Sequence, residues 1–384
     1  MAKSRSVIVL GGGVGGVVAA SILRKRLPSD DRVILIDRES QHLFQSSLLW
    51  LATGKRKAHA IQRPLDRLER KGIEVVTGEV TEMDPASKRV QVNGTELVGD
   101  ALIISLGADL APELVPGLIQ AGHNVYTLDG AAGVHAALEQ FRGGRVVVLT
   151  AAPAYKCPAG PYETAMLVND FLRRRGTRDS RVEIYAAEAG PMATAGPDVS
   201  AMVRGMVEAE GVAYHPTHQI EHVDPAARTL HFTNGISANY DLLIYVPPHR
   251  APAVVRQSGL VGESGWVTVN AQTLQTNVPG VFAIGDVISI PIPSGKALPK
   301  AGVFANRQAQ VVAQNMAAEW TQKESARVFD GTGACFVETG SGRAGYGAGN
   351  FYASPMPEMR FHTPARWWHL GKIAYEKYWF WKWF

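Results

Sequence analysis

Residues 6–27, SVIVLGGGVGGVVAASILRKRL, decide the fold of this chain. The run SVIVL favours a buried β-strand, and Gly11, Gly13 and Gly16 follow it directly. In a βαβ unit the first of these glycines permits a tight turn, the second lets the backbone approach a pyrophosphate, and the third lets the helix pack on the strand. The N-terminus of the helix then faces the phosphates.

An acidic residue stands where such a unit needs one. VILIDRE, residues 33–39, is typical of the next strand and contains Asp37, which lies 21 residues beyond Gly16. A carboxylate at the end of this strand accepts hydrogen bonds from ribose hydroxyls. The sequence therefore predicts a dinucleotide site near the N-terminus.

Length, composition and charge limit the classes of protein to which this chain can belong. The chain has 384 residues, of which 46% are apolar and 19% charged, and its net charge is +4. This length suffices for two or three packed units. No stripe of basic and aromatic residues indicates nucleic acid, and no run of about 18 apolar residues predicts a membrane-spanning helix. Because the basic N-terminus passes directly into a strand, we expect no cleavable signal peptide.

Two later stretches resemble the motifs of flavoproteins with two dinucleotide-binding domains. TNVPGVFAIGDVISI, residues 276–290, resembles their second FAD fingerprint and contains Gly285 and Asp286. ALIISLGADLAPELVPGL, residues 101–118, resembles the connecting motif, in which a strand ends near Gly107 before the chain crosses to the other domain. The resemblance implies that FAD is the cofactor and that the carboxylate of Asp286 binds its ribityl chain or a hydroxyl on the phosphate side.

A second βαβ unit lacks the expected glycines. In VVVLTAAPAYKCPAGPYE, residues 146–163, a strand over 145–150 leads to a helix over about 161–174, and the next strand follows at 182–188. Alanines and prolines occupy the turn, where a Cβ atom or a fixed φ angle hinders the backbone from approaching a phosphate. We therefore expect the electron donor not to be a nicotinamide.

The two cysteines of the chain carry a more specific resemblance. YKCPAGPYE, residues 155–163, resembles the redox-cysteine segment of sulfide:quinone oxidoreductases and of the related flavin subunit of flavocytochrome c sulfide dehydrogenase. In these families an aromatic residue follows a second cysteine, and GACFVETG supplies Cys335 and Phe336. The resemblance implies that Cys157 and Cys335 form a redox pair, bridged at rest by a disulfide or a sulfur-containing link.

The resemblance also implies roles for three further residues. Glu163 matches an acid near the sulfur site, and Lys300, in LPKAGVFANRQAQ, matches a lysine beside the isoalloxazine ring. Phe336 would help to form a quinone slot on the opposite face of the flavin. A third cysteine of many bacterial members would fall near Tyr126, so this chain resembles the forms with two cysteines.

The implied reaction is oxidation of hydrogen sulfide to sulfane sulfur or polysulfide, with two electrons passing through FAD to ubiquinone or menaquinone. Two alternatives stay open. HLFQ (42–45) with LATG (51–54) also resembles type II NADH:quinone dehydrogenases. A flavin subunit that docks a cytochrome is the other, although the cysteine that attaches FAD in the flavocytochrome subunit is absent here.

The C-terminal stretch predicts contact with a membrane surface. WWHLGKIAYEKYWFWKWF, residues 367–384, holds five of the eight tryptophans, with Lys372, Lys377 and Lys382 interleaved. Tryptophan and lysine side chains suit the boundary between lipid headgroups and acyl chains. We therefore expect a peripheral, monotopic protein of the cell membrane. Packing of this tail on its own FAD domain or on a second subunit is the alternative.

We therefore predict an α/β fold with two Rossmann-like domains and a membrane-anchoring tail. The FAD domain comprises residues 1–115 and 250–325, and a degenerate NAD-type domain, 116–249, is inserted between them. Residues 326–384 carry Cys335 and the anchor, and GSGRAGYGAGN (340–350) within them predicts a flexible or tight turn. The spacing of the histidines predicts no metal site. The oligomeric state stays open, a homo-oligomer included.

Overall fold

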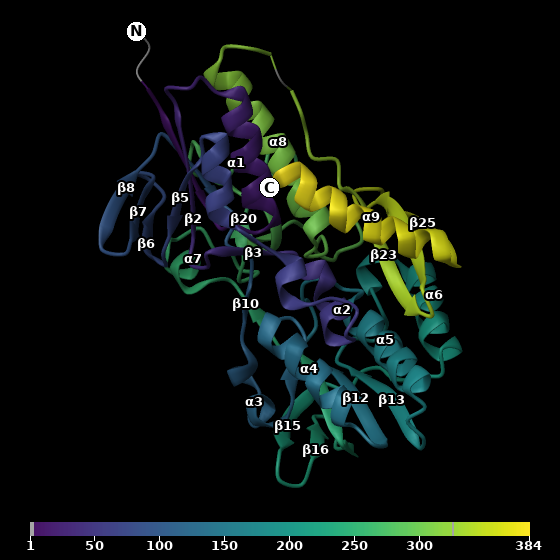
Figure 1. Ribbon diagram of the computed structural model, residues 1–384. Helices are drawn as coiled ribbons and strands as arrows, with labels where there is room; N and C mark the ends of the chain where they lie inside the picture. Colours follow the sequence, from purple (N-terminus) through teal and green to yellow (C-terminus); the bar gives the residue numbers. More distant parts are fainter. Residues whose placement is uncertain (1–3, 325) are drawn as a thin grey trace.

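A parallel sheet of five strands forms around the first glycine motif. The computed structural model describes residues 4–324 and 326–384. Its first sheet has the order β21-β9-β1-β2-β5, and the bounds are β1 Ser6–Leu10, β2 Arg32–Asp37, β5 Glu74–Thr77, β9 Ala101–Ile104 and β21 Val281–Ala283. Helices α1 (Val14–Arg26) and α8 (Gly302–Trp320) lie side by side against it (Figure 1). Val7 to Leu10 are fully buried, as expected for a parallel strand that is covered on both faces.

A second parallel sheet has the order β11-β18-β12-β13-β14. Its strands are β11 His123–Asn124, β12 Gly144–Thr150, β13 Ser180–Ala186, β14 Ala213–His215 and β18 Leu242–Val246, and the associated helices are α4 Leu128–Gln140, α5 Gly160–Arg175 and α6 Pro197–Ala209. The chain passes between the two sheets along a ribbon in which β10 (Asp109–Leu110) pairs antiparallel with β19 (His249–Arg250). Two Rossmann-like sheets confirm the predicted fold class.

Smaller elements complete these two regions. The short sheets are β3 (Gln41–Leu43) with β4 (Gln62–Pro64), β6 (Val80–Asp84) with β7 (Arg89–Val92) and β8 (Thr95–Val98), β15 (Ile220–Asp224) with β16 (Thr229–Phe232) and β17 (Ser237–Asn239), and β20 (Val267–Thr268) with β22 (Ile288–Ser289). The short helices are α2 Leu48–Ala52, α3 Leu118–Ala121 and α7 Ala253–Gln257, with 3₁₀ turns η1 Gln45–Ser47, η2 Ala58–Ile61, η3 Leu65–Lys71, η4 Pro112–Leu114, η5 Ala193–Ala195 and η6 Gly285–Val287.

The C-terminal region is an antiparallel sheet followed by a helix. It consists of β23 (Thr332–Gly340), β24 (Arg343–Asn350), β25 (Glu358–Ala365) and α9 (Arg366–Trp383). The glycine-rich stretch 340–350 contains the predicted turn at 341–342, between β23 and β24, but the rest of it is strand β24, so the prediction was wrong for most of the stretch. Its alternate glycines face a ring: a Cβ atom on Gly347 would lie 2.6 Å from Phe361. Glycine here makes room for a neighbouring strand's side chain and does not mark a loop.

Helix α9 has one buried and one exposed face. Lys372, Glu376, Trp379, Phe380 and Trp383 are buried, whereas Trp367, Leu370, Tyr378 and Trp381 are exposed. The expectation that Lys372 and all of these tryptophans reach the membrane surface was therefore wrong. The buried residues recur every three or four positions, so the period of the helix turns them inward. Among the described residues, no helix is both long enough and apolar enough to cross a membrane.

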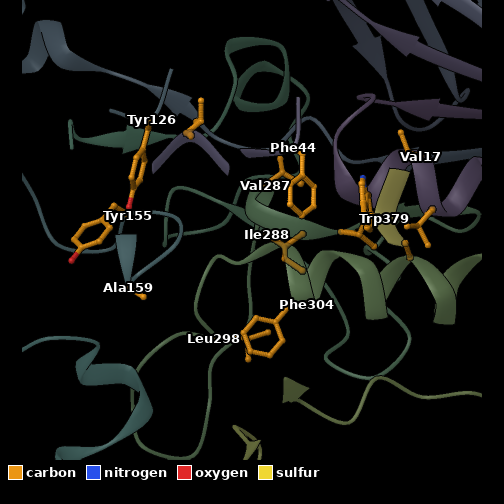
Figure 2. Close-up of a cluster of buried hydrophobic side chains, with 14 of the residues drawn as sticks. Val17, Phe44, Tyr126, Tyr155, Ala159, Val287, Ile288, Leu298, Phe304 and Trp379 are labelled. Atoms are coloured by element: carbon orange, nitrogen blue, oxygen red, sulfur yellow. The ribbon is translucent and has the colours of Figure 1, made fainter. Parts of the chain in front are cut away.

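The buried core joins α9 to the first sheet. Figure 2 shows part of it, where Phe44, Val17 on α1 and Trp379 on α9 belong to one cluster of buried side chains. The rings of Phe44 and Trp379 lie 5.8 Å apart. The C-terminal helix is thus an integral part of the packing.

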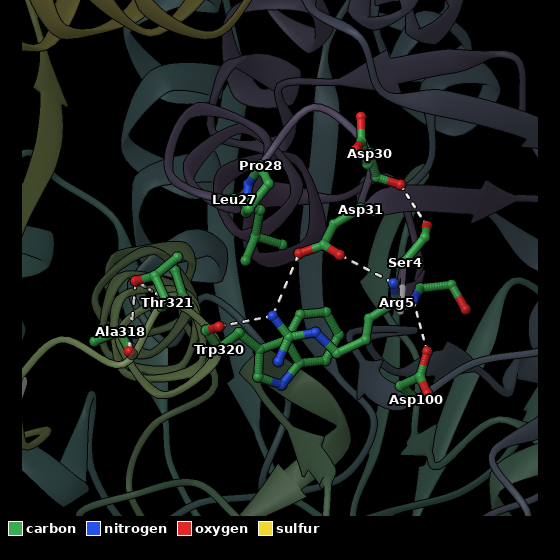
Figure 3. Close-up of polar contacts among 12 residues, drawn as sticks. Ser4, Arg5, Leu27, Pro28, Asp30, Asp31, Asp100, Ala318, Trp320 and Thr321 are labelled. Atoms are coloured by element: carbon green, nitrogen blue, oxygen red, sulfur yellow. Dashed lines mark hydrogen bonds and ion pairs between the residues drawn. The ribbon is translucent and has the colours of Figure 1, made fainter. Parts of the chain in front are cut away.

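Arg5 ties the first strand to the end of α8 (Figure 3). Its guanidinium donates to the carbonyl of Trp320 at 2.7 Å and lies 4.4 Å over the ring of that residue. Its backbone N–H donates to Asp31 at 2.9 Å. These contacts fix β1 and therefore the glycine turn that follows it.

Candidate functional site

One cavity gathers nearly all of the residues that the sequence singled out. It has a volume of about 1860 Å³, and it is lined by residues from the regions of both parallel sheets and from the C-terminal region. Eleven predicted site residues line it, namely Gly11, Gly13, Asp37, Gly107, Cys157, Glu163, Gly285, Asp286, Lys300, Cys335 and Phe336. Gly16 does not line it. Ligand pockets are commonly about 300–1,000 Å³, so this cavity has room for more than one bound molecule.

The three glycines of the first motif have different roles. Gly11 has a φ of +99°, and a Cβ atom on Gly16 would lie 1.8 Å from the carbonyl oxygen of Gly11, so these two glycines allow the turn and the helix packing. A Cβ atom on Gly13 would meet no atom within 4 Å, and Gly13 lines the cavity. No side chain caps the N-terminus of α1. Free N–H groups and open space together suit a phosphate.

Asp37 ends β2 beside this turn. Its carboxylate accepts the backbone N–H of Gly12 at 2.5 Å and that of Glu39 at 2.7 Å. Burial raises the pKa of Asp37, although these two hydrogen bonds oppose the effect. The carboxylate is thus held at the cavity wall, and its remaining lone pairs suit the hydroxyls of a ribose.

Lys300 and Asp286 form a second polar corner of the cavity. The ammonium of Lys300 donates to the carbonyls of Asp286 and Ile288 at 2.7 and 2.8 Å and lies 3.5 Å over the ring of Trp266. Burial lowers the pKa of Lys300 to about 8. Burial also raises the pKa of Asp286. The glycine turn and this corner line the same cavity and give it polar groups for more than one part of a dinucleotide, so these residues fit FAD.

Cys157 lies in the loop that connects β12 to α5. Residues 151–159 separate the two elements, and Cys157 adopts a left-handed φ of +50°. Its N–H donates to the carbonyl of Lys300 at 2.7 Å, and its own carbonyl accepts the hydroxyl of Tyr126 at 2.9 Å. A non-glycine residue in this region carries strain that its surroundings must stabilise, and such residues gather at functional sites.

Cys335 reaches the same cavity from β23. It pairs with Gly347 of β24, and the structure describes both cysteines as free thiols. Burial, and then the negative charge of Glu163, raises the pKa of Cys335 to about 12. The same two causes raise the pKa of Cys157, whereas the ammonium of Lys372 lowers both values. The two thiols therefore share one electrostatic environment.

A buried ion pair lies beside the thiols. The carboxylate of Glu163, in the first turn of α5, accepts the ammonium of Lys372 at 2.8 Å and the backbone N–H of Glu338 at 2.9 Å. The carboxylate of Glu338 in turn lies 2.8 Å from Nδ1 of His369. Burial lowers the pKa of Lys372, but Glu163 and Glu338 outweigh it and raise the pKa above its ordinary value. An ammonium is thus maintained next to the cysteine pair.

Four residues of the site or core were not predicted from the sequence, namely Lys372, Glu338, His369 and Glu376. Lys372 and Glu376 are four positions apart, on the same helical face as Trp379 and Trp383. Read at helical spacing, this stripe of mixed charged and aromatic residues would have indicated a buried face. The partners of these charges lie hundreds of positions away in sequence, as for Glu376, which accepts Arg56 at 2.9 Å.

The second nucleotide position is filled by side chains. The carboxylate of Glu188, just beyond β13, accepts the hydroxyls of Thr150 at 2.7 Å and Tyr162 at 2.5 Å, and also that of Tyr155. In nucleotide-binding units of this type the phosphates lie at the carboxyl end of the first strand. Here two tyrosines and a carboxylate occupy that end of β12, which favours the expectation that no nicotinamide binds there.

Aromatic side chains form the remaining wall. Phe336 lies 5.1 Å from Tyr346, and Tyr346 stacks on Trp368 at 4.6 Å with an angle of 12° between the rings. Phe336, Tyr346 and Phe361 all line the cavity. No group of three or more His, Cys, Asp or Glu side chains in the described part of the chain is arranged to hold a metal ion.

Comparisons with known proteins agree with this geometry. The chain is 26% identical to the sulfide-quinone reductase of Aquifex aeolicus over 99% of its own length and 91% of that protein, and 24% identical to the mitochondrial sulfide:quinone oxidoreductase of Mus musculus over 92% and 80%. It superimposes on the crystal structure of the sulfide:quinone oxidoreductase from Aquifex aeolicus with a TM-score of 0.89, at 24% identity, covering 99% of this chain and 91% of that one. The family model for pyridine nucleotide-disulphide oxidoreductases matches residues 5–313. The chain therefore belongs to the pyridine nucleotide-disulphide oxidoreductase family.

Proposed function

We propose that this protein is a sulfide:quinone oxidoreductase. It oxidises hydrogen sulfide to sulfane sulfur or polysulfide and passes two electrons through FAD to a membrane quinone. The observation that carries the proposal is that Cys157 and Cys335 line the same cavity as the glycine turn. The relatives that match nearly the whole chain carry the same activity in their names.

Residues in several parts of the cavity would hold FAD. Gly11, Gly13 and Gly16 would shape the turn for its pyrophosphate, Asp37 would bind a ribose, and Gly107, Gly285, Asp286 and Lys300 would line the remainder of its site. When bound, FAD accepts two electrons from the cysteine pair and passes them to a quinone.

The sulfur chemistry begins with an oxidised cysteine pair. Hydrosulfide attacks one sulfur of the bridge, so a new S–S bond forms, the bridge breaks, and the other cysteine leaves as a thiolate. A second hydrosulfide takes the outer sulfur of the persulfide and departs as disulfide anion. The thiol and the thiolate that remain give up two electrons and one proton as the bridge forms again.

Lys372 and Glu163 support these steps. The ammonium of Lys372 lowers the pKa of both thiols and so stabilises the leaving thiolate, whose burial would otherwise hold it in the neutral form. The carboxylate of Glu163 orients this ammonium at 2.8 Å.

The quinone enters from the aromatic side. Phe336, Tyr346 and Phe361 offer flat apolar surfaces for ubiquinone or menaquinone on the wall formed by β23, β24 and β25. The exposed residues Trp367, Leu370, Tyr378 and Trp381 of α9 suit insertion among lipid headgroups, which would place the protein on a membrane surface. Residues 1–115 with 250–325 then form the FAD domain, 116–249 the inserted domain, and 326–384 the region that carries Cys335 and contacts the membrane.

The test is anaerobic absorbance of the purified yellow protein. Sulfide should bleach the flavin band, a soluble quinone analogue should restore it, and NADH should have no effect. In Cys157→Ser the FAD should remain while bleaching by sulfide is lost. Bleaching by NADH alone would overturn the proposal in favour of a nicotinamide-dependent quinone reductase. A requirement for an added cytochrome would instead indicate a docking flavin subunit.

A further inference from the structure

A second, smaller cavity lies beside the C-terminal turn of α9. It has a volume of about 340 Å³ and is lined by Gln41, His59, Gln62, Arg63, Pro64 and Arg67. The guanidinium of Arg63 lies 4.0 Å over the ring of Phe380, so α9 packs directly against the residue that lines this cavity. Lys71, further along the same stretch, donates to the carbonyl of Trp383 at 2.7 Å.

The stretch that forms this cavity is strongly basic. Residues 55–71, KRKAHAIQRPLDRLERK, contain seven lysines and arginines against two acids, and we call them the basic segment. Within the described ranges, Arg63 and Arg67 form no ion pair with any carboxylate within 4 Å. Glu376, the buried acid near Arg63, forms its ion pair with Arg56 at 2.9 Å. The guanidinium of Arg63 donates to the carbonyl of Gln62 at 2.5 Å, and the more distant charge of Glu376 acts on it, so the cavity holds two neighbouring positive charges that form no direct ion pair.

We propose that this cavity binds the phosphate headgroup of an anionic phospholipid. Two guanidinium groups supply charge and hydrogen-bond donors for phosphate oxygens, and the amides of Gln41 and Gln62 supply further donors. Trp381, which directly follows Phe380 on α9, is exposed, so the residue that packs on the cavity-lining Arg63 adjoins a ring that can enter a lipid surface. This inference rests on the membrane contact in the proposed function and adds a selective site to it.

The test measures binding of the FAD-loaded protein to sedimented vesicles. One set consists of phosphatidylcholine alone, and the other contains about one part in three phosphatidylglycerol. The protein should bind the anionic vesicles at least about tenfold more tightly, because each basic residue near an anionic surface contributes about fivefold in affinity. Equal binding to both sets would overturn the headgroup site and leave the membrane proposal intact. Absence of binding to either set would contradict both.

Charge reversals separate the cavity from diffuse attraction. Arg67→Glu should weaken binding to anionic vesicles by about 25-fold and leave binding to neutral vesicles unchanged, since it alters two units of charge. Arg70→Glu removes the same charge from the same segment outside the cavity lining and should have a clearly smaller effect. An equal loss in the two variants would overturn the site. Arg228→Glu, on the distant hairpin between β15 and β16, should have no effect.

Two further measurements complete the test. Sulfide oxidation with a soluble quinone analogue should be unchanged in Arg67→Glu, which would show that the variant folds and retains its flavin. Inorganic phosphate should give no calorimetric binding signal in the absence of lipid. A signal that Arg67→Glu abolishes would assign the cavity to a soluble anion and overturn the lipid assignment.

Discussion

At the scale of single residues, the site depends on how charge is arranged around two half-buried thiols that line the cavity. Burial and Glu163 raise the pKa of Cys335 to about 12, and the ammonium of Lys372 limits this rise. Lys372 can do so because Glu163 and Glu338 keep it protonated. The ion pair and the cysteines therefore act together, although they come from α5, α9, β23 and the loop before α5.

Replacing Lys372 with Met should slow sulfide oxidation at least tenfold, because the leaving thiolate loses its counter-charge. The same change leaves Glu163 buried without a partner, so it should also destabilise the fold by about 3–5 kcal/mol. The double variant Glu163→Gln with Lys372→Met should regain much of that stability but not the rate. Lys377→Met, on the exposed face of α9, is the matched control. If the double variant recovered the rate as well, Lys372 would have only a structural role.

The cysteine pKa values predict slow alkylation of the reduced protein. With a pKa of about 12, against an ordinary 9.0, Cys335 has about a thousandfold less thiolate near neutral pH. Because thiolate increases with pH below the pKa, the rate with iodoacetamide should rise about tenfold per pH unit from pH 7 to about 10. Mass spectrometry of each labelled cysteine measures this. A rate that levels off near pH 8 would contradict a raised pKa for Cys335.

At the scale of elements, β24 shows how sequence chemistry can be misread. Its glycines alternate, so they lie on one face of a strand, and two of them, Gly345 and Gly347, lie against the ring of Phe361. Gly347→Ala should destabilise the protein by about 1–3 kcal/mol, because a Cβ atom would lie 2.6 Å from that ring. Gly205→Ala on α6 is the matched control: no atom lies within 4 Å of its added Cβ, and alanine favours helix, so it should stabilise by about 0.5–1 kcal/mol. Thermal unfolding measures both, and a stable Gly347→Ala would contradict the packing.

Substitutions on the two faces of helix α9 should have different effects on membrane binding and on stability. Trp381 is 80% exposed and Trp379 is 1% exposed. Trp381→Ala should therefore reduce vesicle binding with little change in stability, whereas Trp379→Ala should cost about 3–5 kcal/mol because it leaves a cavity in the core. Vesicle sedimentation and thermal unfolding of the two variants form the comparison. Equal vesicle binding by Trp381→Ala and the parent protein would contradict the role of the exposed face.

At the scale of the whole molecule, the sequence predicted those structural units whose key residues lie close together in the chain. The strand, the glycine turn and Asp37 are close in sequence, so the first unit could be predicted, and the altered turn at Cys157 marked the second. The position of Lys372 could not be predicted from its neighbours, because its partner Glu163 lies on α5 and only the packing of α9 brings them together. Aromatic and lysine residues in the tail indicated contact with a membrane surface. Because this interpretation used the composition and not the helical spacing, it did not predict the buried face of α9.

Helix α9 is also part of the structural framework of the molecule. Buried charges tie it to both other regions, because Lys372 pairs with Glu163 on α5 and Glu376 accepts Arg56 and the hydroxyl of Ser47. Deleting residues 366–384 would leave Glu163 and Arg56 without these partners and expose Trp50, which Arg56 overlies at 4.5 Å. The shortened protein should therefore unfold at a clearly lower temperature and lose FAD, beyond any loss of membrane binding.

Thermal unfolding and flavin absorbance after gel filtration measure this outcome. Leu370→Ser with Trp381→Ser, which alters only exposed positions of the same helix, is the control and should retain FAD and thermal stability. If the deleted protein stayed yellow and as stable as the parent protein, α9 would be a membrane anchor alone. In the proposed function, the helix whose exposed face meets the lipid also carries the ammonium of Lys372, so membrane contact and sulfide chemistry would depend on one element.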